Sequence, residues 1–226
     1  HFALQVFSTS ATYGRKVVCP FGTPCTTLIK YLEQNYPTSG TWLGDVILEA
    51  VHYLAFRTPH WAGDYAWNVG MVGTPSDPWY EVVGGDTVSC SCRPTFVIIT
   101  SDGGSNSDTK KPTCNHLPWY PSPYGNPHTD FYDYDYDSSY ANGIDPFDTN
   151  ASMGSNHNRD GDDIAYYAHI NDLRPDADPV YGVPDTQTAT FYTLYLFARG
   201  DDNDADSILF RRIAMNGGFR DVPGDT

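Results

Sequence analysis

One carboxylate stands where α/β proteins often hold ligands. Asp102 stands just after the apolar run 96–100, from which only Ser101 separates it, and precedes two glycines. In open α/β sheets, ligands bind at the carboxyl ends of the strands. Thr41, with Ser39 just before it, opens the most regular helical pattern in the chain. These oxygens form a hard-ligand set that suits Mg²⁺ or Ca²⁺. Ordinary roles fit the same residues, since Asp-Gly is common turn chemistry and Thr41 also suits a helix N-cap.

Five cysteines offer a second chemistry, the formation of disulfides. They stand at positions 19, 25, 90, 92 and 114. A turn rich in Gly and Pro separates Cys19 from Cys25 and favours a local bond between them. A bond between Cys90 and Cys92 would be strained, so we expect Cys114 to pair with Cys92 or Cys90. The spacing does not match a zinc site. The sequence therefore predicts an oxidising, extracytoplasmic compartment and leaves one thiol over.

Enzyme chemistry finds little support in the sequence. There is no Gly-x-Ser-x-Gly elbow, and no cysteine stands in a recognisable nucleophile context. His1 raises one alternative, because an amino-terminal histidine binds copper in the monooxygenases that cut polysaccharides. Those enzymes use a mostly β scaffold, whereas this chain has α/β periodicity. We therefore predict a binding or structural protein and no enzyme.

The charge balance excludes further partners. The chain of 226 residues has 13 basic and 28 acidic side chains, a net charge of −15. A phosphate backbone and an anionic membrane surface would both repel it. No run approaches the roughly 20 apolar residues that span a bilayer. The acidic stretches 130–137, 158–162 and 200–206 resemble calcium loops only in part, and we interpret Asp130–Asp137 as a solvated loop. The sequence predicts no nucleic-acid partner and no membrane span.

The candidate ligands require elements that position them. Apolar residues at helical spacing predict a helix over 43–56 with one face against a core. The run 95–100 predicts a strand buried on both faces. This α/β order favours a mostly parallel sheet flanked by helices, in a single domain over 1–226. Two long, loop-rich insertions, about 57–94 and 103–160, are expected to be functional or braced by disulfides. Further patterns predict strands over 2–7 and 188–198 and helices over 26–36, 162–169 and 207–215.

Several blocks of the sequence resemble a known family. Phe2–Phe7, Thr41–Ala50 and Phe96–Gly103 resemble the second strand, the threonine loop with its helix, and the central strand of a von Willebrand factor type A domain. A narrower resemblance is to the amino-terminal region of PilY-type proteins, the tip adhesins and biogenesis factors of type IV pili. It rests on residues 44–53, 92–100, 105–108, 162–175 and 216–219, of which 162–175 is the most specific block.

The resemblance implies an extracellular adhesion module at the surface of a bacterial pilus. Such domains usually hold a divalent cation through Asp-x-Ser-x-Ser, a threonine and a later aspartate, and the last two fall on Thr41 and Asp102. Asp-x-Ser-x-Ser has no match in the sequence, so we expect another segment to supply it together with the first strand. The implied partners are proteins of a pilus or filament tip and a host or surface ligand. The alternative is a metal-free structural subunit of an extracellular filament or tip complex.

Overall fold

The computed structural model describes residues 2–7, 15–34, 43–57, 73–74, 76–101, 161–176, 178, 182–196 and 205–218. The chain divides into two compact units, which we describe separately. The first unit comprises residues 1–40, 49–93 and 172–187. The second comprises residues 41–48, 94–171 and 188–226.

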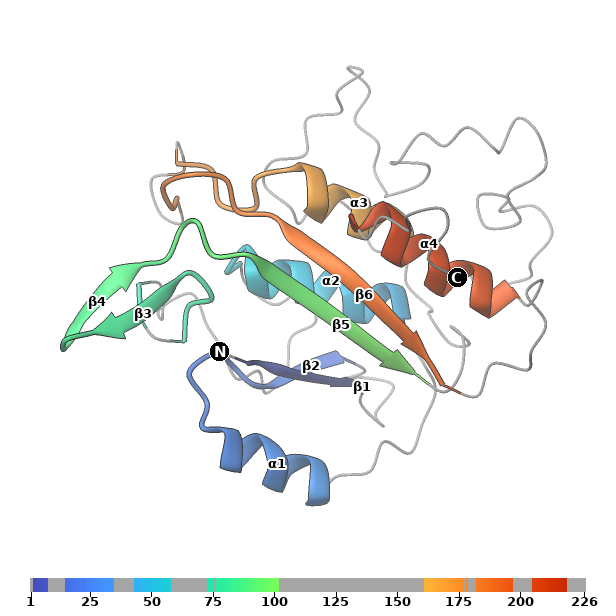
Figure 1. Ribbon diagram of the computed structural model, residues 1–226, viewed down its shortest axis with the longest axis horizontal. Helices are drawn as coiled ribbons and strands as arrows, with labels where there is room; N and C mark the ends of the chain where they lie inside the picture. Colours follow the sequence, from blue (N-terminus) through green and yellow to red (C-terminus); the bar gives the residue numbers. More distant parts are fainter. Residues whose placement is uncertain are drawn as a thin grey trace, which may run out of the picture. The chain divides into compact units, whose positions relative to one another are not determined.

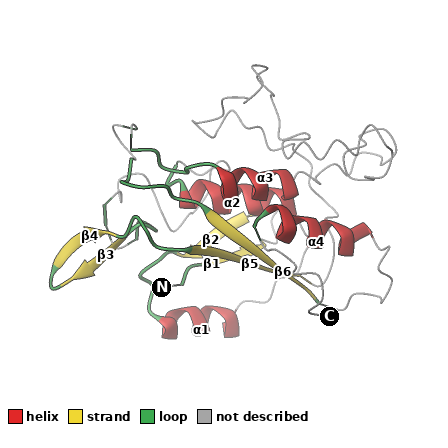
Figure 2. Ribbon diagram, turned by 45° about the horizontal axis from the view of Figure 1, so that its top comes forward, coloured by secondary structure: helices red, strands yellow, loops and turns green. Residues whose placement is uncertain are grey.

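The second unit is built on a pair of parallel strands. Strands β5 (Thr95–Ser101) and β6 (Ala189–Tyr195) pair in parallel register from Thr95↔Ala189 to Ser101↔Tyr195. Helices α3 (Gly161–Ile170) and α4 (Ala205–Asn216) pack on each other and on β6 (Figure 1). Figure 2 shows both helices on one side of the strand pair. The strands predicted over 95–100 and 188–198 and the helices predicted over 162–169 and 207–215 are thereby confirmed.

Strand β5 is buried on one face only, so the prediction of burial on both faces is wrong. Ile99 is 5% exposed, whereas Phe96 and Ile98 on the opposite face are 55% and 70% exposed. The reason is the position of α4. It covers the face that carries Phe191 and Tyr195, which lies on the same side as Ile99.

The first unit contains two antiparallel strand pairs. Strands β1 (Leu4–Phe7) and β2 (Arg15–Cys19) form one pair, and β3 (Tyr80–Val83) and β4 (Asp86–Ser89) form a hairpin. The hairpin turns at Gly84 and Gly85, whose φ angles of 65° and 100° favour glycine. Helix α1 (Cys25–Gln34) confirms the helix predicted over 26–36. We did not predict β2 or the hairpin, which lies inside the expected insertion 57–94.

Helix α2 (Leu43–Leu54) runs through both units and confirms the helix predicted over 43–56. In the second unit, Ile47 lies beside Gly161, where an added Cβ would be 3.0 Å from the Ile47 Cδ1 atom. In the first unit, Tyr53 and Phe56 form a core cluster with Val17 of β2. The helix is buried on its polar side as well as on its apolar stripe, so it lies deeper in the protein than a one-sided pattern implies.

The carboxyl end of α2 has a Schellman geometry with a phenylalanine at its left-handed position. Phe56 has a φ of 52°, its amide donates to the carbonyl of Tyr53, and the Arg57 amide donates to the carbonyl of His52. Glycine is the usual residue here because a side chain strains this conformation. Phe56 is fully buried, so its packing outweighs that strain.

Candidate functional site

The two candidate cation ligands, Thr41 and Asp102, lie outside the described residues. Their flanks are described. Asp102 follows Ser101, the last residue of β5, and α2 begins at Leu43. Ser101 is buried, and its carbonyl accepts a hydrogen bond from the Leu196 amide at 2.8 Å. The sequence position of Asp102 is thus directly after the carboxyl end of a parallel strand pair, the usual ligand edge of α/β proteins.

A row of polar side chains in α2 was not predicted. Asp45, Glu49 and His52 recur at i, i+4 and i+7, and all three are at most 1% exposed. Each makes at least one polar or electrostatic interaction. Over the ranges the structure describes, no group of three His, Cys, Asp or Glu side chains is arranged to hold a metal ion. The available signal was the helical spacing of the three polar residues, whereas the prediction considered only the apolar stripe of this helix.

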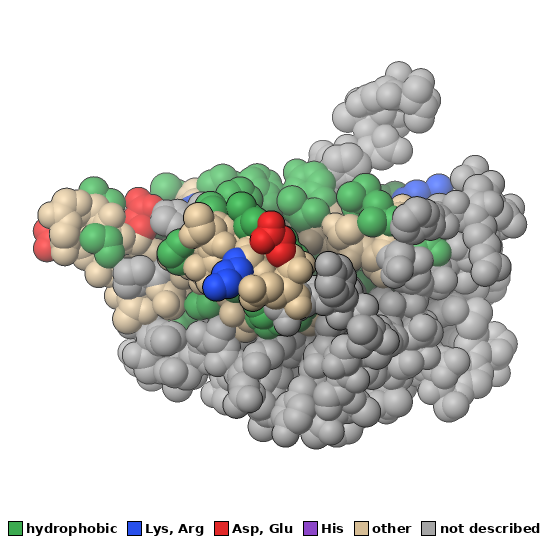
Figure 3. Space-filling view, turned by 90° about the horizontal axis from the view of Figure 1, so that it is seen from below, with side chains coloured by type: hydrophobic (Ala, Val, Ile, Leu, Met, Phe, Trp, Pro, Cys, Tyr) green, Lys and Arg blue, Asp and Glu red, His purple; other side chains and the backbone are tan. Residues whose placement is uncertain are grey.

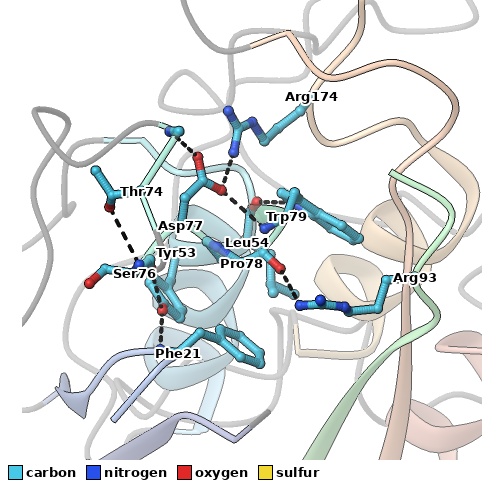
Figure 4. Close-up of polar contacts among 11 residues, drawn as sticks. Phe21, Tyr53, Leu54, Thr74, Ser76, Asp77, Pro78, Trp79, Arg93 and Arg174 are labelled. Atoms are coloured by element: carbon cyan, nitrogen blue, oxygen red, sulfur yellow. Dashed lines mark hydrogen bonds and ion pairs between the residues drawn. The ribbon is translucent and has the colours of Figure 1, made fainter. Parts of the chain in front are cut away.

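The first unit contains a buried ion pair between Asp77 and Arg174. The distance from Arg174 Nη1 to Asp77 Oδ1 is 2.5 Å, and both side chains are fully buried. Asp77 also accepts hydrogen bonds from the amides of Gly73 and Trp79, each at 3.1 Å (Figure 4). The bond to the Trp79 amide is an Asx turn, which shapes the loop before β3. Three donors therefore compensate the buried carboxylate.

Two aromatic rings lie near the Arg174 guanidinium. Its guanidinium carbon lies 5.7 Å from the ring centre of Phe56 and 6.0 Å from that of Tyr80. Both distances are within the range of cation–π attraction. Trp79 is also fully buried, and its indole nitrogen donates to the Leu54 carbonyl at 2.8 Å. The ion pair thus joins the loop 73–79 to the end of α2 and to the segment that begins at Asp172.

Tyr53 links α2 to two loops. Its hydroxyl accepts from the Phe21 amide at 2.7 Å and donates to the Ser76 carbonyl at 3.0 Å (Figure 4). The rings of Phe21 and Tyr53 stack with their centres 5.8 Å apart. Burial raises the pKa of Tyr53 far above its ordinary value. The hydroxyl therefore keeps its proton and its donor role at physiological pH.

The segment 172–187 is held by its own hydrogen bonds. One oxygen of Asp172 accepts from the amides of Arg174 and Gln187, at 3.0 and 3.1 Å. Further along, Asp178 forms an ion pair with Arg57. Residues 172–175 belong to the most specific block of the resemblance, and they lie at the centre of this network.

In the second unit, the same block 162–175 contacts the block 216–219. Gly218 has a φ of 90°, and a Cβ atom there would lie 2.2 Å from the ring of His169. A Cβ at Gly217 would lie 2.5 Å from the Cβ of Phe191. Only glycine fits at both positions. The blocks 162–175 and 216–219 are therefore joined by close packing.

Both arrangements hold the fold, and the one around Asp77 is closed to solvent. Asp77, Arg174 and Trp79 are all fully buried, so a ligand in solvent does not reach them. Sequence reasoning singled out the block 162–175 but not the partner of its Arg174, because Asp77 lies 97 residues from Arg174. The Ser-Asp-Pro-Trp sequence at 76–79 was the available signal, since Asp before Pro is typical of a turn.

The cysteine prediction differs from the structure at Cys19 and Cys25. Cys19, Cys25, Cys90 and Cys92 are all free thiols here, so the predicted bond between Cys19 and Cys25 is absent. Cys19 is buried at the end of β2, and this burial raises its pKa, whereas Cys25 is exposed at the first residue of α1. Cys90 and Cys92 are free as well, so the predicted bond from one of them to Cys114, which lies outside the described residues, is not formed either.

No known protein family, curated protein or solved structure matches this chain. Within the part that the structure describes, no helix has the length and apolar character needed to cross a membrane. The described residues form a mixed α/β architecture. A parallel strand pair carries two helices, and two antiparallel strand pairs precede its second strand in the sequence.

Proposed function

We propose that this chain is an extracellular adhesion or binding module of a PilY-type, type IV pilus-associated tip protein, with a von Willebrand A-like fold. The observation that carries the proposal is the place of Asp102 in the chain. It follows the buried carboxyl end of β5, beside the parallel strand β6. A carboxylate at that edge has the position and the chemistry of a cation ligand in an α/β protein.

The packing of the resemblance blocks supports the same proposal. Arg174 is fully buried against Asp77, and Gly218 lies against His169. Residues that were selected by resemblance alone therefore occupy positions where substitution would disturb the core. This is the pattern expected when a sequence block specifies a fold.

The proposed activity is binding through a divalent cation, Mg²⁺ or Ca²⁺. Thr41 and Asp102 supply hard oxygens that suit either ion, but two side chains do not replace the roughly six oxygens that it requires. Another polypeptide segment with the Asp-x-Ser-x-Ser motif would supply the rest. The bound cation would offer one coordination position to a carboxylate of a tip protein or surface ligand.

Calorimetric titration with each ion tests this proposal. We expect weak or no binding by the 226 residues alone, and measurable binding once an Asp-x-Ser-x-Ser segment is joined to them. In the longer protein, Asp102→Ala should abolish binding. Asp86→Ala is the matched control, because Asp86 is an exposed acid in the hairpin of the other unit. Tight binding that survives Asp102→Ala would move the ion to the acidic loops and overturn the mechanism.

The second candidate is a metal-free structural subunit of a filament or tip complex. The buried network around Asp77 and Arg174 favours it, because such enclosed charges fix a shape without presenting a ligand site. If the chain is a metal-free subunit, a chelator should leave its assembly into the complex unchanged. If its function depends on a cation, a chelator should prevent binding to its partner.

A further inference from the structure

The turn that follows the hairpin β3–β4 carries two cysteines one residue apart. Cys90 comes directly after β4, and its carbonyl accepts from the Arg93 amide at 3.0 Å. This bond closes a β-turn with Ser91 and Cys92 at its centre. Both cysteines are free thiols, of which Cys92 is exposed and Cys90 partly exposed. The first unit therefore presents a dithiol that molecules in solvent can reach.

Hydrogen bonds on both sides hold this turn in place. The Cys90 amide donates to the carbonyl of Trp79 at 2.7 Å, and Trp79 is fully buried. The Ser91 hydroxyl donates to the Asp185 carboxylate at 2.8 Å. The turn is thus fixed to the core by its first residue and to the segment 182–187 by its second. The fold therefore sets the spacing of the two thiols.

This spacing permits a bond between the two sulfurs but strains it. Two residues of extended chain span about 7 Å, and a turn shortens that distance. Disulfides join Cα atoms that are about 4.4–6.8 Å apart, so Cys90 and Cys92 are within reach of each other. The ring that they close is small, and strained or exposed disulfides are the easily reduced ones. A bond at this turn is therefore expected to form and break reversibly.

The surroundings of the two thiols give them different roles. Partial burial raises the pKa of the Cys90 thiol, and the guanidinium of Arg93 opposes this rise. A hydrogen bond to Glu81 and the charge of Cys92 raise that pKa further, so the two sulfurs lie within electrostatic range of each other. The thiolate is the nucleophile, so a raised pKa makes Cys90 the less reactive thiol. Cys92, the more exposed one, is then the group that an incoming disulfide meets first.

Acidic side chains lie beside this turn and on the hairpin. Figure 3 shows them at the left, over the hairpin β3–β4, whose strands carry Glu81 and Asp86. The Asp185 carboxylate contacts Ser91, the residue between the two cysteines. The basic side chain in the turn, Arg93, is already paired with Glu81. In a chain of net charge −15, this environment attracts molecules that carry positive charge.

We propose that Cys90 and Cys92 form a thiol–disulfide exchange site for positively charged disulfides, a function separate from the adhesion proposed above. The Cys92 thiolate attacks one sulfur of the incoming disulfide, whose S–S bond breaks. One half leaves as a thiolate and takes up a proton, and the other half stays on Cys92 as a mixed disulfide. Cys90 then loses its proton and attacks the Cys92 sulfur, which releases the second half as a thiol. The cysteine pair is oxidised by two electrons, and the incoming disulfide is reduced to two thiols.

Peptide mapping without reduction follows this exchange. The probe is cystamine, a small disulfide with two ammonium groups, which is added to the reduced protein. It should join Cys90 to Cys92, and dithiothreitol should restore both thiols. In Cys90→Ser the reaction should stop at a mixed disulfide on Cys92. In Cys92→Ser the remaining thiol should react about tenfold or more slowly. Cys25→Ser is the matched control, because Cys25 is an exposed thiol in α1, and it should leave the exchange at the turn unchanged.

Disulfides of different charge test the substrate class. Each rate is divided by the rate of the same disulfide with β-mercaptoethanol, which corrects for intrinsic reactivity. At low salt, cystamine should then react about tenfold or more faster than the anionic glutathione disulfide, and NaCl should reduce this preference. Asp185→Asn keeps an oxygen that accepts from Ser91 but removes the charge. It should lower the preference about twofold or more.

Three results would overturn the inference. Stable mixed disulfides on both cysteines, with no bond between them, would show that the turn does not bring the two sulfurs together. A bond from Cys90 or Cys92 to Cys114 would assign that thiol to a structural pair. Equal corrected rates for cystamine and glutathione disulfide at low salt would exclude selection by charge.

Discussion

Asp77 and Arg174 show what a buried charge requires in this protein. The Asp77 carboxylate has three donors, and the Arg174 guanidinium lies within about 6 Å of two aromatic ring centres. Removing one partner would leave the other charge buried and uncompensated. We expect Arg174→Ala to lower the free energy of unfolding by about 3–5 kcal/mol, measured by urea denaturation.

A second ion pair provides the control for this prediction. The Arg93 Nη2 and Glu81 Oε2 atoms also lie 2.5 Å apart, but the two side chains are 22% and 32% exposed. Water already solvates such a pair, so Arg93→Ala should cost about 1 kcal/mol or less. Equal losses for Arg174→Ala and Arg93→Ala would contradict the account, because burial would then not decide the cost.

Tyr53 predicts a loss of stability at high pH. An unfolded tyrosine loses its proton near its ordinary pKa of 10, whereas the pKa of buried Tyr53 is raised. Above pH 10 the native state therefore binds more protons than the unfolded state, and the free energy of unfolding falls as pH rises. Below pH 10 Tyr53 is protonated in both states and contributes no slope.

The variant Tyr53→Phe should reduce this pH dependence. It should also cost about 1–3 kcal/mol near neutral pH, because the Phe21 amide loses its acceptor and the Ser76 carbonyl its donor. Denaturation at several pH values gives both quantities. Tyr31 and Cys19 have raised pKa values too, so a smaller slope should remain. An unchanged slope in Tyr53→Phe would show that Tyr53 is not the main source.

Among the elements, α2 makes the sharpest prediction about packing. Ile47 is fully buried and lies beside Gly161 at the start of α3. Ile47→Ala should destabilise the protein by about 2–5 kcal/mol, as for other buried large-to-small changes. The exposed Ile98 is the matched control, and Ile98→Ala should change stability by about 0.5 kcal/mol or less. A melting temperature that Ile47→Ala leaves unchanged would refute the placement of α2.

Periodicity located the helices because it reports a local property of the chain. The spacing from Leu43 to Leu54 and the run Thr95–Thr100 predicted α2 and β5 to within a few residues. The hairpin β3–β4 was missed although Val82-Val-Gly-Gly-Asp86 has a two-residue turn between short strands. In that case the signal was present, and the many prolines and tryptophans nearby obscured it.

What covers an element is not a local property, and here the sequence misled. Nothing in the residues of β5 indicates that α4 lies over one face only. The partner of Arg174 is equally hidden, since Asp77 is distant in sequence and stands in a stretch without periodicity. The candidate cation site depends on a segment with a motif that the chain does not contain. The place of Asp102 directly after β5 was predictable, whereas the motif that would complete a cation site was not.

At the scale of the whole molecule, the net charge of −15 is the main electrostatic feature. Charges of one sign repel one another within the folded chain and lower its stability. The Debye length shortens from about 30 Å at 0.01 M salt to about 10 Å at 0.1 M, so added salt relieves this repulsion. The buried pair of Asp77 and Arg174 is shielded from salt and should contribute little to the effect.

We therefore expect NaCl to raise the melting temperature, by about 2–4 °C for each kcal/mol of repulsion relieved. Magnesium or calcium chloride at the same ionic strength separates general screening from a specific site. For the 226 residues alone, these salts should raise the melting temperature little beyond the NaCl effect. For the protein joined to an Asp-x-Ser-x-Ser segment, they should raise it further. Asp102→Ala removes one of 28 acidic groups, so it leaves general screening nearly unchanged and should abolish only the extra gain. Calorimetric melting curves measure each term, and an extra gain that persists in Asp102→Ala would place the ion away from the end of β5.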